Sequence, residues 1–226
     1  MGLVKNILIT TAIIALILFL RAQAADTETV MLTINVPMET SLEELENVLE
    51  VFEKTNTNGT FFVPGNYNHT SVIPSQHEIS CYTNSESRLA PLKGENLSSE
   101  LRNCTGVGFR APHMDVGNAS YQIIREEFAY DSSVYHRYEW FWQEPKGLEQ
   151  IPITSVLMLP LDSSLSINFI GDFFFTLARK SQQETVVIAL GAQDLQEHLL
   201  DFEFLIRHYQ EESKITTIGD WLLSSE

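Results

Sequence analysis

Short apolar runs alternate with amphipathic stretches from the first third of the chain onward. The run at 30–36 (VMLTINV) predicts a buried strand, and apolar residues at helical spacing over 42–54 predict a helix. Ser41 and Glu44 fit the hydroxyl-x-x-acid pattern that caps the start of such a helix. A second apolar run follows at 60–63. The order strand, helix, strand is typical of a parallel α/β unit.

The same alternation continues to the end of the chain. The further elements that we predict are strands at 77–81, 106–110, 185–190 and 214–218, and helices at 120–127, 173–181 and 195–209. Residues 82–105 are expected to be mostly loop, and 134–170 are aromatic and irregular. The pattern predicts an α/β domain with a largely parallel sheet, and the number of strand-helix units favours a barrel over an open sheet.

Charge narrows the range of partners. The 226 residues include 14 Lys and Arg against 30 Asp and Glu, which gives a net charge of −16. Binding to phosphate groups needs clustered Lys and Arg, and the longest basic run here is Arg179-Lys180. We therefore expect no binding to nucleic acid or to an anionic membrane.

The first residues have the features of a targeting segment. One Lys precedes an apolar stretch at 7–20, and Ala22-Gln23-Ala24 supplies the small residues of a cleavage site. A membrane span needs about 20 apolar residues, which this stretch lacks. We expect a cleaved signal peptide at 1–24 and a secreted domain at 25–226 without a membrane span. An uncleaved anchor is the alternative.

Two further features of the sequence are relevant to a secreted protein, its cysteines and its glycosylation triplets. Cys81 and Cys104 are the only cysteines, and an oxidising compartment favours their pairing as a disulfide, with two buried thiols as the alternative. Five Asn-x-Ser/Thr triplets are possible glycan acceptors, of which we expect only some to be used. They begin at Asn58, Asn68, Asn96, Asn103 and Asn118.

Four segments, in this order, resemble the polysaccharide deacetylases of the NodB-homology type, carbohydrate esterase family 4 (CE4). They are 60–65 (TFFVPG), 77–79 (HEI), 108–112 (GFRAP) and 130–133 (YDSS). The resemblance covers nearly the whole mature chain and is greatest to the small chitin-deacetylase-like proteins of microsporidian parasites. It implies a distorted (β/α) barrel of the NodB type and, for active members, zinc-dependent deacetylation of polymers such as chitin.

The chain departs from the family at the positions that do the chemistry. The resemblance places Asn35 at the general base, Gly191 at the general acid, and Val36, Tyr82 and Glu86 at the metal ligands. An amide is no base near neutral pH, and a valine side chain has no lone pair for a metal. A catalytic zinc needs about three protein ligands. The sequence therefore predicts no metal cofactor and no deacetylase activity.

Two supporting residues of the family pattern are retained. The resemblance implies that Arg110 orients the catalytic base and that Asp131 tunes the acid. Because the groups that they would orient are replaced, we expect both to remain as buried hydrogen-bond or ion-pair supports of the strand ends.

An active chitin deacetylase with a rebuilt zinc or other divalent metal site is the alternative function. His113 and Asp115 follow a strand end and have suitable ligand atoms, together with His69, His77 or His136. No two of these histidines have a recognised ligand spacing, so ordinary surface or hydrogen-bonded histidines are the simpler interpretation.

The aromatic segment 135–142 (YHRYEWFW) is a candidate sugar-binding surface, because exposed rings stack on sugar faces. Packing at the end of the barrel is the alternative. The rings in question are Tyr135, Tyr138, Trp140 and Trp142.

The leading interpretation is a secreted protein of the cell surface or wall without deacetylase activity. Its expected role is structural, or the binding of chitin or another wall polysaccharide.

Overall fold

A computed structural model describes residues 29–84, 95–112, 118–133, 149–150, 155–156 and 185–225. Its strands are β1 (Thr29–Asn35), β2 (Thr60–Pro64), β3 (Glu78–Tyr82), β4 (Gly108–Arg110), β5 (Tyr130–Asp131), β6 (Glu149–Gln150), β7 (Ser155–Val156), β8 (Thr185–Gly191) and β9 (Lys214–Thr216). Its helices are α2 (Leu42–Thr55), the 3-10 turn η1 (Thr70–Val72), α3 (Glu95–Glu100), α4 (Asn118–Glu127), α6 (Leu199–Glu212) and α7 (Ile218–Ser225).

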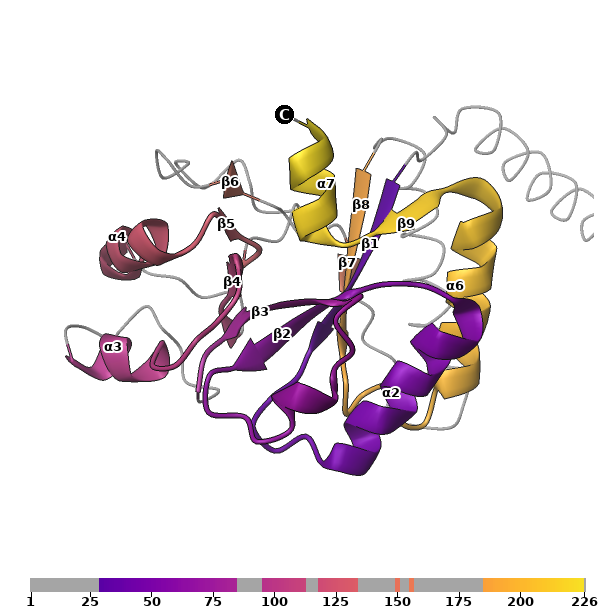
Figure 1. The fold of residues 1–226 in the computed structure, drawn as a ribbon, viewed down its shortest axis with the longest axis horizontal. Helices are drawn as coiled ribbons and strands as arrows, with labels where there is room; N and C mark the ends of the chain where they lie inside the picture. Colours follow the sequence, from indigo (N-terminus) through magenta and orange to yellow (C-terminus); the bar gives the residue numbers. More distant parts are fainter. Residues whose placement is uncertain are drawn as a thin grey trace, which may run out of the picture.

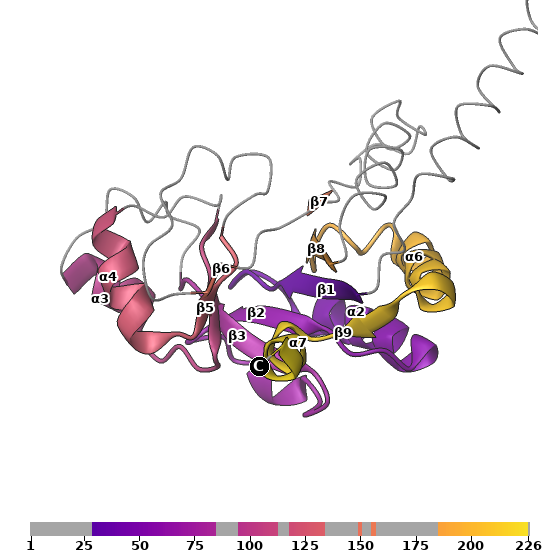
Figure 2. The ribbon, with the colours of Figure 1, turned by 90° about the horizontal axis from the view of Figure 1, so that it is seen from above.

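The strands form one curled sheet in the order β6-β5-β4-β3-β2-β1-β8-β7, and β9 pairs with β1 (Figures 1 and 2). Every pair between the described strands is parallel. A parallel, curled sheet with helices along its outside is the predicted class, a distorted (β/α) barrel, and that prediction is confirmed.

β1 lies at the centre of this sheet. One of its edges pairs with β8 along its whole length of seven residues. The other edge is shared, because Thr29–Met31 pair with β9 and Thr33–Asn35 pair with β2. β1 therefore connects elements from both ends of the chain.

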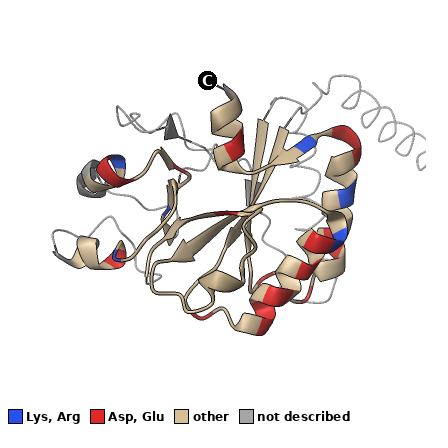
Figure 3. Ribbon diagram, in the orientation of Figure 1, with Lys and Arg blue, Asp and Glu red and all other residues tan. Residues whose placement is uncertain are grey.

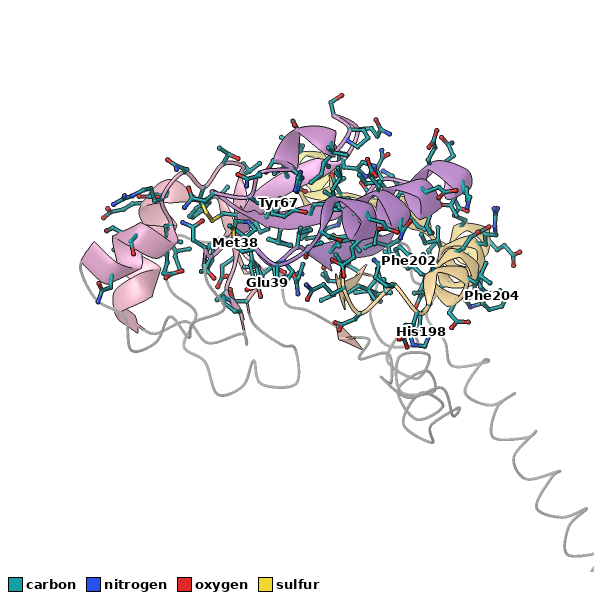
Figure 4. All side chains as sticks on the ribbon, turned by 90° about the horizontal axis from the view of Figure 1, so that it is seen from below. Met38, Glu39, Tyr67, His198, Phe202 and Phe204 are labelled. Atoms are coloured by element: carbon teal, nitrogen blue, oxygen red, sulfur yellow. A yellow bond between two sulfur atoms is a disulfide. The ribbon has the colours of Figure 1, made fainter. Side chains whose placement is uncertain are left out.

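α2 begins and packs as its sequence predicts. Ser41 Oγ accepts a hydrogen bond from the Glu44 N–H at 3.2 Å, and the Glu44 carboxylate accepts one from the Ser41 N–H at 2.7 Å. α6 lies beside α2, and the Phe202 and Phe52 rings meet at 5.4 Å. Phe204, two residues along α6, is exposed (Figure 4). One face of α6 is thus buried against the sheet and α2.

Alternate strand residues face two different hydrophobic clusters, as the pleat of a strand requires. The outer cluster lies between the sheet and helices α2 and α6 and includes Val30, Leu32, Ile34, Val186 and Ile188. The inner cluster lies on the concave face and comprises Met31, Phe62, Tyr82, Tyr130, Val187 and Ile218. Side chains at the strand ends therefore lie together only if they are on the same face of the sheet.

Some predicted elements differ from the structure or lie outside it. α6 begins at Leu199 rather than at residue 195, because turns occupy 192–197. α3 is a short helix within the stretch expected to be loop. The predicted helix at 173–181 and the predicted signal peptide lie outside the described residues. Within the described ranges, no helix has the length and apolar character to cross a membrane.

Acidic residues are concentrated along α2 (Figure 3). The exposed acids of this helix include Glu43, Glu46, Glu50 and Glu53. Such a surface repels phosphate groups, in keeping with the net charge of the whole chain.

Candidate functional site

The carboxyl ends of β1, β4, β5 and β8 form an edge that we call the rim. Barrels of parallel strands place their functional residues at this edge. Asn35 and Gly191 are partners in the β1–β8 pairing, and Arg110 is the last residue of β4. Ser132 follows β5 directly. The rim therefore brings together the family positions for the base, the acid and one orienting residue.

Arg110 is the centre of the hydrogen bonds at the rim. The side chain is 1% exposed, and its guanidinium carbon lies 4.0 Å from the centroid of the Phe62 ring. Nη1 donates to Thr33 Oγ1 at 2.7 Å and to Asn35 Oδ1 at 3.0 Å. Nε and Nη2 donate to the Ser132 carbonyl oxygen at 3.0 Å and to its hydroxyl at 2.7 Å. Arg110 thus connects β4 to β1 across the concave face, although β2 and β3 lie between them in the sheet.

The guanidinium keeps its charge in this buried position. Desolvation lowers the pKa of Arg110 to about 10, and nearby Tyr130, Tyr82 and Asp131 offset part of that effect. A pKa near 10 leaves the side chain protonated at neutral pH. The rim therefore contains a permanent positive charge behind Asn35.

Asp131 fixes the chain at the end of β5. It is fully buried, and its Oδ1 accepts hydrogen bonds from the Ser133 N–H at 3.0 Å and from the Ser133 hydroxyl. That hydroxyl accepts a bond from the Ala111 N–H at 2.8 Å, which joins the ends of β4 and β5. Asp131 thus organises the backbone beside Arg110.

Asn35 has a defined orientation because of Arg110. Arginine has only donors, so the amide oxygen of Asn35 must face the guanidinium. The amide nitrogen, Nδ2, then faces the other way, and the residue is only half-buried. A neutral amide, with its oxygen already bonded, therefore stands at the position that the resemblance assigns to the general base.

Val36 faces away from the rim. It is fully buried in the outer cluster, which also contains Leu45 and Tyr67. Its backbone N–H donates to the Phe62 carbonyl at 3.0 Å, which continues the strand pairing. The Val36 side chain therefore lies in the apolar layer under α2 and offers no ligand atom at the rim.

The other family positions for a metal give no better set of ligands. Tyr82 is 6% exposed and packs in the inner cluster, and Glu86 lies outside the described residues. Across the described ranges, no three His, Cys, Asp or Glu side chains lie close enough to hold a metal ion. The described residues at the family positions do not fit a divalent cation.

Sequence reasoning missed one acidic residue at the rim. A Cβ atom built on Gly191 would lie 2.3 Å from the Asp194 carboxylate oxygen Oδ2. Asp194 belongs to the turn after β8, where the Leu195 N–H donates to the Gly191 carbonyl at 3.2 Å. A carboxylate therefore fills the space that a side chain at the family's acid position would take. The signal in the sequence was a strand-ending glycine with an acid three residues later.

His77 lies far from the rim, before the first residue of β3. Its ring is 7% exposed and packs edge-on against Phe52 and Phe61, with ring centroids at 5.2 and 5.1 Å. Its Nδ1 accepts a hydrogen bond from the Gly59 N–H at 3.1 Å, and burial lowers its pKa to about 4. His77 is a neutral core residue, so its assignment to a rebuilt metal site beside the strand ends was wrong.

His69 is the other described histidine of that hypothesis. Its ring packs edge-on against Tyr67, with centroids 5.5 Å apart. Tyr67, labelled in Figure 4, donates its hydroxyl to the Thr40 carbonyl at 2.9 Å, in the segment after β1. The remaining candidates lie outside the described residues: His113, Asp115, His136, and the aromatic residues Tyr135, Tyr138, Trp140 and Trp142.

The opposite end of the concave face also contains an ionisable side chain. Glu78 Oε1 accepts hydrogen bonds from the Tyr130 hydroxyl at 2.8 Å and from Ser80 at 3.0 Å. Its Oε2 accepts bonds from the Thr60 hydroxyl and from the Gly219 N–H, both at 2.8 Å. Gly219 is in the first turn of α7, so this helix covers the end where β2 and β3 begin.

A disulfide joins Cys81 of β3 to Cys104, with a Cα–Cα distance of 5.2 Å.

Among the possible glycan acceptors, Asn103 is exposed, but its amide nitrogen donates to Asn66 Oδ1 at 2.7 Å. The others differ in exposure: Asn68 and Asn96 are exposed, Asn58 is half-buried, and the side chain of Asn118 lies outside the described residues. Glycosylation at these positions stays a prediction.

Comparison with known proteins finds similarity in fold only. No protein-family model matches the chain, and no curated protein matches its sequence. The Xyl-CE4 domain of a multidomain xylanase from the hindgut metagenome of Trinervitermes trinervoides superposes with a TM-score of 0.59 at 14% identity, covering 88% of this chain and 91% of that one. A family 4 acetyl xylan esterase from Clostridium thermocellum, solved with a cobalt ion, gives 0.56 at 14% identity, with 85% and 89% covered.

A CE4 family pseudoenzyme from Bacillus anthracis superposes with a TM-score of 0.54 at 15% identity, covering 86% of this chain and 65% of that one. A mutant of that pseudoenzyme, described as having restored enzymatic activity, gives 0.56 at 14% identity, with 86% and 67% covered. The chain therefore has the fold of the CE4 polysaccharide deacetylases. Because both enzymes and a pseudoenzyme share this fold, the residues at the rim must decide between them.

Proposed function

We propose that this protein is a secreted CE4-fold pseudoenzyme with a structural or saccharide-binding role at the cell surface or wall. The observation that carries the proposal is the hydrogen bond of 3.0 Å from Arg110 to Asn35. It holds a neutral amide where the family's general base would stand. The saccharide partner that we infer is chitin or another wall polysaccharide.

The chemistry of hydrolysis supports an inactive rim. General base and general acid catalysis each contribute roughly 10²–10⁴ in rate. Asn35 cannot accept a proton, and Gly191 has no side chain to donate one. Neither Asn35 nor Gly191 therefore supplies a partner for proton transfer.

The position of Val36 supports the same proposal by separate means. A metal-bound water becomes a nucleophile only when protein ligands hold the metal at the strand ends. Val36 instead contributes an apolar side chain to the outer cluster, facing α2. Replacing it by Asp would bury a carboxylate among hydrophobic residues rather than create a ligand at the rim.

Acetate release from chitin oligosaccharides tests the absence of catalysis. The full chain is incubated with the oligomers in the presence of zinc or cobalt, beside an active CE4 deacetylase as the positive control. We expect acetate at the level of the buffer alone. Release that is proportional to protein and stopped by a chelator would show an active deacetylase, with a metal site outside the described residues.

Titration calorimetry with the same oligomers separates the two non-catalytic roles. A saccharide-binding protein gives saturable heat, whereas a purely structural one gives none. Saturable binding without acetate release is the combined result that we expect.

A further inference from the structure

Two polar side chains lie next to each other on the concave side of the rim. Asn35 and Gly191 are direct partners in the pairing of β1 with β8. Val187 belongs to the inner cluster, and residues at even spacing along a strand face the same side, so the Cβ direction of Gly191 is also inward. The Asp194 carboxylate lies in that direction, 2.3 Å from the Cβ position. Asp194 and Asn35 therefore occupy neighbouring places at the ends of two paired strands.

The Asn35 side chain presents a donor at this place. Its oxygen is bonded to Arg110, which leaves both N–H bonds of Nδ2 directed away from the guanidinium. Within the described residues, Nδ2 makes no hydrogen bond. Because Arg110 is itself fixed by Thr33 and Ser132, the amide is held in one orientation without a ligand.

The Asp194 side chain presents an acceptor. It is exposed, and an ionised carboxylate only accepts hydrogen bonds. It makes neither a hydrogen bond nor an ion pair with the described part of the chain. Its position comes from the turn after β8, which is closed by the hydrogen bond from the Leu195 N–H to the Gly191 carbonyl.

A donor held in one orientation beside an exposed acceptor favours particular ligand groups. A sugar hydroxyl accepts from an amide N–H and donates to a carboxylate, and an acetamido group does the same with its C=O and N–H. An ammonium group has only donors, so it cannot accept from Nδ2, and the positive charge of Arg110 lies behind that amide. An anionic sugar would be repelled by the Asp194 carboxylate and by the net charge of −16 on the chain.

We propose that Asn35 and Asp194 together contact a neutral sugar group, with the Asn35 amide donating to it and the Asp194 carboxylate accepting from it. This inference rests on the saccharide-binding role proposed above and adds the two residues and the class of sugar. It gives a function to Asp194, which the family pattern does not use.

Calorimetry on the full-length chain tests the pair with fully acetylated chitin hexasaccharide as the probe. We expect Asp194→Ala to raise Kd about tenfold, since a hydrogen bond to a charged group is lost. Asp194→Asn keeps one acceptor oxygen and should raise Kd by a smaller factor. Glu211→Ala, which removes an exposed acid on α6, is the matched control and should leave Kd unchanged.

A second probe and a stability measurement complete the test. At high ionic strength, which screens the attraction of its ammonium groups to this acidic chain, the fully deacetylated hexasaccharide should bind more weakly than the acetylated one. It lacks the acetamido groups, whose C=O accepts from Asn35 and whose N–H donates to Asp194. The unfolding temperature of Asp194→Ala should equal that of the unmodified chain, since the carboxylate is exposed. A lowered unfolding temperature in parallel with weaker binding would assign Asp194 to the turn and overturn the proposal.

The remaining outcomes separate this inference from the proposed function. If the chain binds the hexasaccharide and Asp194→Ala binds it equally well, the pair is not a contact, while the saccharide-binding role stands. If the unmodified chain gives no saturable heat, both the pair and the saccharide-binding role are wrong, and the structural role remains.

Discussion

The two ends of the concave face each hold one ionisable side chain in hydrogen bonds, but with different results. Glu78 receives hydrogen bonds from three side chains and from the backbone of α7, which covers that end. Arg110 donates to Thr33, Asn35 and Ser132 at the rim. At the Glu78 end the bonds hold neighbouring elements together. At the rim one hydrogen bond also orients the Asn35 amide, so that its Nδ2 faces away from the guanidinium.

Under the proposed function, this difference describes a fold that keeps its shape without the family's reaction. Buried charges must stay bonded, whatever the protein does, because an unpaired buried charge is strongly destabilising. Arg110 has such a partner in Asn35, a neutral amide whose oxygen accepts its hydrogen bond. The hydrogen bonds of Arg110 therefore account for the architecture of the rim whether or not the rim is catalytic.

Replacing the charge at the rim should have the largest effect. We expect Arg110→Met to lower the free energy of unfolding by about 3–5 kcal/mol, because Asn35 and Ser132 lose their donor and buried Asp131 loses the nearby positive charge. Urea denaturation measures this change. Arg207→Met, at an exposed pair with Glu203, is the matched control and should cost about 0.5 kcal/mol or less. Similar losses in both variants would contradict a structural role for Arg110.

The imidazole of His77 should make the end opposite the rim sensitive to acid. Its pKa is lowered from 6.5 to about 4, so the unfolded chain binds a proton more readily than the folded one between these values. This contribution is fully present above pH 6.5 and is lost as the pH falls towards 4, by about 3 kcal/mol in total.

His77→Phe isolates that contribution. At pH 7.5 the variant should be less stable by about 1–2 kcal/mol, since the Gly59 N–H loses its acceptor. Denaturation curves at pH 7.5 and 4.5 should show the difference from the unmodified chain shrinking or reversing at the lower pH. A difference that is constant with pH would show that His77 does not titrate in this way.

Glu78→Gln tests the closed end directly. We expect the free energy of unfolding to fall by about 2 kcal/mol. The carboxylate now accepts from hydroxyl and N–H donors, and in the variant an amide nitrogen, itself a donor, would face some of them. Glu53→Gln, at an exposed position of α2, should change the stability little. Equal effects in the two variants would remove the reason for treating this end as structural.

Asn35→Ala should have the smallest effect of the series, about 1 kcal/mol or less. Arg110 keeps its bonds to Thr33 and Ser132, and Asn35 is only half-buried. Thermal unfolding monitored by circular dichroism is sufficient to measure it. A loss as large as that of Glu78→Gln would mean that the rim is as firmly structural as the opposite end.

The sequence predicted the elements whose cause is local. The capping pair Ser41 and Glu44 defines the start of α2, and the apolar run before Asn35 defines β1. Alternation along that strand also decides that Asn35 and Val36 face opposite sides, because successive residues of a strand do so. The resemblance, which compares residues position by position, assigned both to one site.

The positions of two other residues depend on contacts that no local pattern contains. His77 is buried by Phe52 and Phe61, which come from an earlier helix and strand. Asp194 reaches the rim because the chain turns after β8 before α6 begins, whereas helical spacing predicted a helix from 195 onward. In both cases tertiary packing overrides the tendency that the sequence shows.

The shared edge of β1 has a consequence for how the molecule is made. During synthesis β1 emerges early, yet its partners β8 and β9 begin at residues 185 and 214. Contacts between segments so far apart in sequence are slow to form, because a long loop must close first. The ribosome must therefore add about 150 residues after β1 before this strand can pair with β8, and until then the nascent chain exposes an unpaired strand edge that chaperones can bind.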